Sequence, residues 1–123
     1  DDVEKAVGRL FAIYLEHSRV YLSKAMWRDA MAVSTQQPDS PSGLLYADLD
    51  SRLASQVCAL IRTLQERGAV RTEIDSIAVG QMLFNNMNMM FTIYVKTEAM
   101  SVRKLLAIIA RQARPLLRAI VTS

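Results

Sequence analysis

The stretch DSIAVGQMLFNNMNMMFTIYVK, residues 75–96, decides how the rest of the chain is arranged. Its interior, residues 76–95, carries no charged side chain. A helix that is apolar on nearly every face must be covered on nearly every face. One layer of neighbouring helices from a 123-residue chain does not supply that cover. We therefore expect a bound ligand or a second copy of the protein to cover the remainder.

The same stretch is long enough to span a membrane, but its polar residues favour a buried helix of a soluble domain. Unpaired amides in hydrocarbon are costly, and here the polar residues are ordered along one stripe at spacings of four, three and four: Gln81, Asn85, Asn88 and Thr92. One flank of this stripe carries Phe84, Met87, Phe91 and Tyr94. The other flank carries Val79, Met82, Met89, Met90 and Ile93. We expect no membrane segment.

The whole chain predicts an all-α fold of about five helices in a single domain, residues 1–123. Hydrophobic residues make up 51% of the sequence, and only four glycines and three prolines interrupt it. No segment alternates cleanly between apolar and polar residues, as a half-buried strand would. The periodicity predicts helices at 2–17, 19–33, 44–67, 75–96 and 101–121, with a loop at 34–43.

Several residues are expected to mark the helix ends. Ser18 is suited to cap the second helix, although one continuous helix over 2–33 remains an alternative. Gly68 is suited to end the third helix. Either Thr72 or Asp75 is suited to cap the central helix, and Ser101 the last one.

The side-chain inventory argues against an enzyme, a metal site or a bound cofactor. The chain has one His and one Cys, which cannot form a catalytic triad or a metal-binding cluster. His17 is interpreted as a surface or capping residue and Cys58 as a packed thiol. A net charge of +3 is mild. The basic residues of the last helix are interpreted as a solvated face rather than a nucleic-acid surface: Arg103, Lys104, Arg111, Arg114 and Arg118.

The run LIRTLQERGAVRTEIDSIAVGQMLFNNMNMMF, residues 60–91, resembles the effector-binding C-terminal domain of TetR-type transcriptional regulators. Such regulators often end a long helix with arginine-glycine, here Arg67-Gly68. A short link, residues 69–74, then leads to an aspartate, Asp75, and into an apolar helix. The helices before and after this run follow the family's order, so the resemblance lies in organisation and covers nearly the whole chain.

This resemblance implies a cytoplasmic homodimer in which the last two helices of each subunit form a four-helix bundle. It also implies a pocket for a small hydrophobic effector and a role in transcription regulation, most often as a repressor. DNA would be bound only through an N-terminal helix-turn-helix, which this chain lacks. The chain begins without methionine inside a helical pattern, and we expect it to be a piece of a longer protein.

Two sets of site residues follow from the pattern and the resemblance. We predict that the ligand pocket is lined by Met26, Trp27, Met31, Tyr46, Cys58, Ile61, Phe84, Met87, Asn88 and Phe91. We predict that the dimer seam is formed by Val79, Met82, Met90, Ile93, Val102, Leu105, Ile109, Leu116 and Ile120. The alternatives are a helical carrier for lipids or other apolar molecules, and a purely structural dimerisation module with a filled core.

Overall fold

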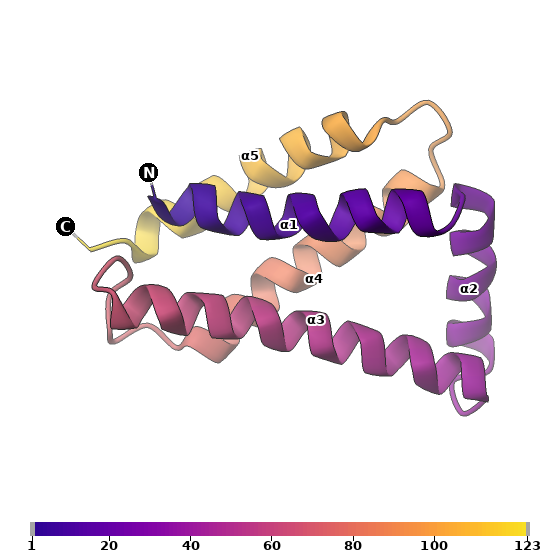
Figure 1. Ribbon diagram of the computed structural model, residues 1–123, viewed down its shortest axis with the longest axis horizontal. Helices are drawn as coiled ribbons and strands as arrows, with labels where there is room; N and C mark the ends of the chain where they lie inside the picture. The colour runs from indigo at the N-terminus through magenta and orange to yellow at the C-terminus, as the bar shows by residue number, and fades with distance from the viewer. Residues whose placement is uncertain (1, 123) are drawn as a thin grey trace.

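The computed structural model describes residues 2–122 and confirms the all-α prediction (Figure 1). Its helices are α1 (Asp2–Tyr21), α2 (Lys24–Gln36), α3 (Pro41–Glu66), α4 (Ser76–Val95) and α5 (Val102–Ile120). The described part contains no strand, only an isolated antiparallel bridge between Val70 and Val121. Within residues 2–122, none of the helices combines the length and hydrophobicity that crossing a membrane requires.

The helices are arranged around α4, which lies behind α1 and α3 in Figure 1. α3 packs most extensively against α4, and α1 packs against both α5 and α3. α2 runs across one end of the bundle, between the end of α1 and the start of α3 (Figure 1). Towards α2, α3 and α4 diverge (Figure 1), and residues of both helices in this region line a cavity.

The first helix ends at Tyr21, four residues later than predicted, and Ser18 is not the cap of the second helix. The hydroxyl of Ser18 donates to the carbonyl oxygen of Tyr14 at 2.8 Å, a bond made inside a continuing helix. The N-cap of α2 is Ser23, whose hydroxyl oxygen accepts from the backbone N–H of Met26 at 3.2 Å. The prediction failed because both serines have suitable chemistry and the sequence does not say which one the helix passes through.

The predicted loop at 34–43 is also shorter than expected. α2 continues to Gln36 and α3 begins at Pro41, which leaves residues 37–40 as the connection. Ser40 caps α3 by accepting from the backbone N–H of Gly43 at 3.1 Å. Proline at the first helical position is favoured, so residues that resembled a loop form the start of α3.

The predicted ends of the later helices are confirmed. Gly68 follows α3 with a φ of +80°, a left-handed conformation that favours glycine at a helix C-terminus. The carboxylate of Asp75 accepts from the backbone N–H groups of Ile77 and Ala78 at 3.1 and 3.0 Å. It therefore caps α4, and Thr72 does not. The hydroxyl oxygen of Ser101 accepts from the N–H of Lys104 at 3.1 Å and caps α5.

α3 and α4 cross in backbone contact at Cys58 and Gly80. A Cβ atom added to Gly80 would lie 2.6 Å from both Cα and Sγ of Cys58. The thiol of Cys58 donates to the carbonyl oxygen of Ile77 at 3.4 Å. Gly80 is therefore required by the close approach of the helices, because any side chain there would push them apart.

We expect Gly80→Ala to lower the free energy of unfolding by about 1–3 kcal/mol, because the methyl group overpacks the crossing. Gly8→Ala is the matched control, since a Cβ atom at Gly8 in α1 meets nothing within 4 Å. That control should instead gain about 0.5–1 kcal/mol from higher helix propensity. Chemical unfolding followed by circular dichroism measures both, and equal effects in the two variants would contradict the prediction.

Candidate ligand-binding site

The larger cavity of the described chain has a volume of about 460 Å³. α1 and α3 form its walls and α4 forms its floor, while Trp27 of α2 closes one end. Cavities that hold small molecules typically measure ~300–1,000 Å³. The volume and the enclosure by four helices are therefore those of a small-molecule site.

Three helices line this cavity with the same spacing. α1 contributes Tyr14, His17, Ser18 and Tyr21, together with Leu15; α3 contributes Tyr46, Leu49, Asp50 and Leu53; α4 contributes Phe84, Met87, Asn88 and Phe91. On each helix these positions follow the pattern i, i+3, i+4 and i+7, which places them on one face. The lining is thus built from one face of each of three helices.

Aromatic side chains are concentrated here. Six of the chain's eight aromatic residues line the cavity. The ring of Trp27 meets Phe91 edge-on, with centroids 5.4 Å apart, and lies 6.4 Å from the ring of Tyr21. Its indole N–H donates to the carbonyl oxygen of Ser18 at 2.8 Å. This bond holds α2 against the end of α1 and keeps the Trp27 ring in the cavity.

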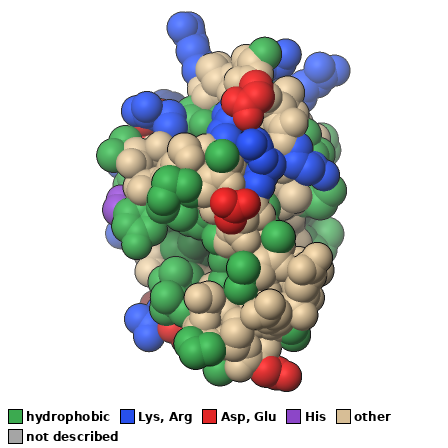
Figure 2. Space-filling model, turned by 90° about the vertical axis from the view of Figure 1, so that its right-hand side faces the viewer, with side chains coloured by type: hydrophobic (Ala, Val, Ile, Leu, Met, Phe, Trp, Pro, Cys, Tyr) green, Lys and Arg blue, Asp and Glu red, His purple; other side chains and the backbone are tan. Residues whose placement is uncertain are grey.

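The cavity opens to solvent between α1 and α3. Tyr21 and Leu49 are 68% and 49% exposed, whereas Phe84 and Met87 on the floor are each 4% exposed. Figure 2 views the molecule from the α2 end, and hydrophobic side chains reach the surface on its left, the side that faces the viewer in Figure 1. An apolar ligand could enter here without first displacing charged side chains from the lining.

A small polar group interrupts the apolar lining. The amide of Asn88 donates to Oδ2 of Asp50 at 3.4 Å. Burial raises the pKa of the Asp50 carboxyl, and the bond from Asn88 partly opposes that rise. Burial, assisted by the charge of Asp50, raises the pKa of Tyr46 to about 12. At neutral pH the Tyr46 hydroxyl is therefore protonated and able to donate a hydrogen bond.

The structure brings together six of the ten residues predicted to line the ligand: Trp27, Tyr46, Phe84, Met87, Asn88 and Phe91. The other four do not line this cavity. Cys58 lies at the α3–α4 crossing against Ile77, and Ile61 is fully buried in the core. Met26 is 54% exposed on α2, and Met31 packs against the outside of the core.

The contribution of α1 was missed entirely, as were Leu49, Asp50 and Leu53 of α3. The sequence does contain a signal for the contribution of α1, because Tyr14, Ser18 and Tyr21 share a helical face. His17, interpreted as a surface residue, is exposed but stacks on Tyr21 with centroids 5.9 Å apart, at the edge of the cavity. The predicted end of the helix at residue 17 concealed this face.

The predicted dimer seam requires correction. Val102, Leu105, Ile109 and Ile120 are between 0% and 5% exposed within a single chain, so no surface is left for a partner to cover. These residues lie on the side of α5 that packs against α1 and α4. Val79 and Met90 are 9% and 8% exposed and are also core residues. Met82 is 58% exposed, while Ile93 and Leu116 are half-buried.

α4 is therefore not covered all round by its own chain. Met82 and Met89 are 58% and 55% exposed on the side away from the cavity. The polar stripe is divided between environments, because Gln81 and Asn85 are exposed while Asn88 lies in the cavity. Asn85 is thus not the buried amide that the pattern suggested, and its side chain can bind water.

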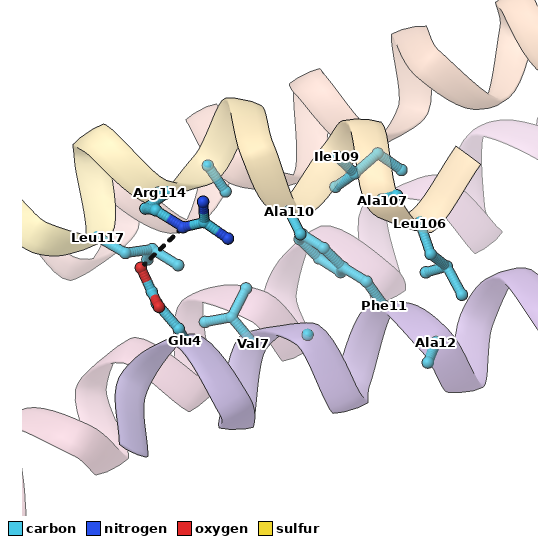
Figure 3. Close-up of a pocket in the computed structure, with 12 residues that line it drawn as sticks. Glu4, Val7, Phe11, Ala12, Leu106, Ala107, Ile109, Ala110, Arg114 and Leu117 are labelled. Atoms are coloured by element: carbon cyan, nitrogen blue, oxygen red, sulfur yellow. Dashed lines mark ion pairs between the residues drawn. The ribbon is translucent and has the colours of Figure 1, made fainter. Parts of the chain in front are cut away.

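A smaller groove of about 310 Å³ lies between α1 and α5 (Figure 3). Small side chains, including Ala12 and Ala110, leave the space between the helices. At one end the carboxylate of Glu4 pairs with Arg114 and Arg118 at 3.6 and 3.7 Å. Two arginines of the basic last helix are therefore used within the chain, to hold α5 on α1.

The described residues contain no group of three or more His, Cys, Asp or Glu side chains that could hold a metal ion. No protein-family model matches the chain, and no curated protein or solved structure is significantly similar to it. The candidate site therefore has to be interpreted from its own geometry.

Asp50→Asn should stabilise the protein at neutral pH. The pKa of Asp50 is raised above its usual value of 3.8 in the folded state, so ionisation opposes folding. Ionised Asp50 lowers the free energy of unfolding as pH rises through the pKa of this carboxyl in the folded protein. The loss is absent below its pKa in the unfolded protein. Unfolding measured against pH should show the two proteins converging in acid. Asp48→Asn is the control, since this exposed carboxylate pairs with Arg52 at 2.9 Å, and it should give no such gain at neutral pH.

Proposed function

We propose that this chain is the ligand-sensing and dimerisation domain of a TetR-type transcriptional regulator. The observation that carries the proposal is the cavity of about 460 Å³ lined by six aromatic residues. A purely structural module would gain stability by packing these side chains against one another, because burial of apolar surface stabilises the fold. The open mouth between Tyr21 and Leu49 supports occupation by a ligand that enters and leaves.

The ligand would be a small, largely apolar molecule with an aromatic or extended hydrocarbon body. Phe84, Phe91 and Trp27 offer ring faces and edges, and Met87 offers a flexible thioether that adapts to different shapes. The polar group formed by Tyr46, Asp50 and Asn88 would orient the molecule. This combination of a mostly apolar wall and a few polar groups is typical of small-molecule sites.

Regulation would act through α1 and α2. A ligand in the cavity contacts one face of α1, and the bond from Trp27 to Ser18 couples α2 to the end of that helix. In such regulators the DNA-reading part precedes this region of the chain. A ligand that binds one arrangement of α1 more tightly shifts the population toward it, which would change the spacing of the two DNA-reading parts in a dimer.

Phe84→Leu should weaken binding of N-phenylnaphthylamine, a neutral hydrophobic probe, by about three- to tenfold, because an aromatic contact with the ligand is lost. Trp27 is the only tryptophan and lines the cavity, so quenching of its fluorescence reports occupancy directly. Phe11→Leu is the matched control, since Phe11 is a buried aromatic residue outside this cavity. Equal losses in both variants, or no binding by the wild-type protein, would contradict the proposal.

The dimer would form through the exposed side of α4 and the adjoining side of α5. Met82, Met89 and Ile93 present an apolar strip, and Ile108 and Leu116 of α5 are half-buried beside it. The amide of Asn86 donates to Gln112 at 2.9 Å between these two helices. Pairing two copies of this face would produce a four-helix bundle and cover the part of α4 that its own chain leaves exposed.

Met89→Glu should raise the dimer dissociation constant at least about tenfold, because it places an unpaired charge in the apolar interface. Ile13→Glu is the control, since Ile13 of α1 is 59% exposed and Met89 is 55% exposed. Sedimentation equilibrium on the wild-type and variant proteins measures the constant. A wild-type protein that is monomeric at micromolar concentration would overturn the proposed dimer.

The regulator and a hydrophobic-ligand carrier differ in what precedes the first helix of the full-length protein. A helix-turn-helix directly before Asp1 would support the regulator and exclude the carrier. Any other class of preceding domain would contradict the regulator while leaving the proposed ligand site to its own test.

A further inference from the structure

Among the described residues that line the larger cavity, Asp50 is the one acidic residue and none is Lys or Arg. The one basic side chain in this lining is that of His17, an exposed residue at the edge of the cavity. An ionised carboxylate removed from water is costly unless it is paired or hydrogen-bonded. Apart from His17 at the edge, the described lining of the cavity supplies no basic side chain to balance the carboxylate of Asp50.

The contacts of Asp50 also include no basic partner for its carboxylate. Within residues 2–122, no Lys, Arg or His nitrogen lies within ion-pair distance of its carboxylate. Its side-chain hydrogen bond comes from Asn88, at a long 3.4 Å to Oδ2. By contrast, Asp48 on the outer face of the same helix pairs with Arg52 at 2.9 Å. The carboxylate of Asp50 thus remains able to accept from a further donor.

The aromatic residues around Asp50 are suited to the same kind of ligand. The faces of aromatic rings attract cations, most strongly when the site excludes water. The aromatic cluster already makes one such contact at its far end, where the ammonium group of Lys24 lies 4.3 Å from the ring centroid of Tyr94. Tyr94 stacks on Phe91, and Phe91 lines the cavity.

We propose that the cavity selects amphiphilic cations, with an ammonium group near Asp50 and Tyr46 and an aromatic or alkyl body against Phe84, Phe91 and Trp27. This inference rests on the proposed ligand-binding function and specifies the charge of the ligand. The carboxylate supplies Coulombic attraction in a site partly removed from water, and the rings supply cation–π attraction and apolar contact. An anionic ligand of the same shape would face the uncompensated charge of Asp50 and be disfavoured.

The experiment uses three probes of one shape that differ in charge. They are a phenylalkyl trimethylammonium ion, the tert-butyl compound in which carbon replaces nitrogen, and the phenylalkyl carboxylate of matched length. Isothermal titration calorimetry gives each affinity at neutral pH. We expect the cation to bind about tenfold more tightly than the neutral compound and the carboxylate to bind most weakly.

Two variants test whether Asp50 is the cause. Asp50→Asn keeps the size and removes the charge, and it should reduce the preference for the cation over the neutral compound to about twofold or less. Asp48→Asn removes a charge from the exposed face of the same helix and should leave the preference intact. Loss of the preference in both variants would indicate a general surface-charge effect and overturn the assignment to Asp50.

The outcomes separate this inference from the function on which it rests. Equal binding of the cation and the neutral compound by the wild-type protein would overturn the charge preference while supporting a hydrophobic-ligand site. A preference that survives Asp50→Asn would overturn the role of Asp50. Failure of all three probes to bind would contradict the proposed ligand site and this inference together.

Discussion

The backbone contact between Cys58 of α3 and Gly80 of α4 is the constraint on which the rest of the structure depends. α3 and α4 make the most extensive contact between any two helices, and Gly80 allows them to meet here without a side chain between them. On the α2 side of this crossing the two helices diverge (Figure 1). The segment of α3 around Asp50 and the segment of α4 around Asn88 consequently face each other across a space rather than packing tightly. The cavity is therefore a consequence of the crossing.

The other helices close this space without filling it. α1 supplies a wall, and Trp27 of α2 enters the open end, held by its hydrogen bond to Ser18. α5 holds α1 in place from the opposite side through its apolar stripe and the pairing of Glu4 with Arg114. Most of the apolar surface is covered in this way. Among the features left open to solvent are the cavity with its carboxylate and the exposed strip of α4 that carries Met82 and Met89.

The site was predictable where one helix contains the information and unpredictable where several must be combined. Phe84, Met87 and Phe91 were predicted to share one flank of α4 because 3.6-residue periodicity defines its flanks, and all three line the cavity. Ile61 and Cys58 were assigned wrongly because apolar residues of α3 look alike in sequence, although some face the core and others the cavity. Asp50 was not predicted to line the site, because charged residues on a helix usually face solvent and it was interpreted as part of a solvated face. Its place in the cavity becomes evident only from its position opposite Asn88 in the folded chain.

The sequence by itself determined that the chain is helical, where most helices end and which flank of α4 is apolar, since periodicity and capping are local properties. Only the tertiary structure decided that α5 buries its stripe in its own chain rather than against a second copy. An apolar stripe specifies that a surface must be covered, but it does not specify by what. The location and lining of the cavity depend on the angle at which α3 and α4 cross. The contact of residues 58 and 80 fixes where the two helices meet, and these residues lie apart along the chain and come together only in the folded protein.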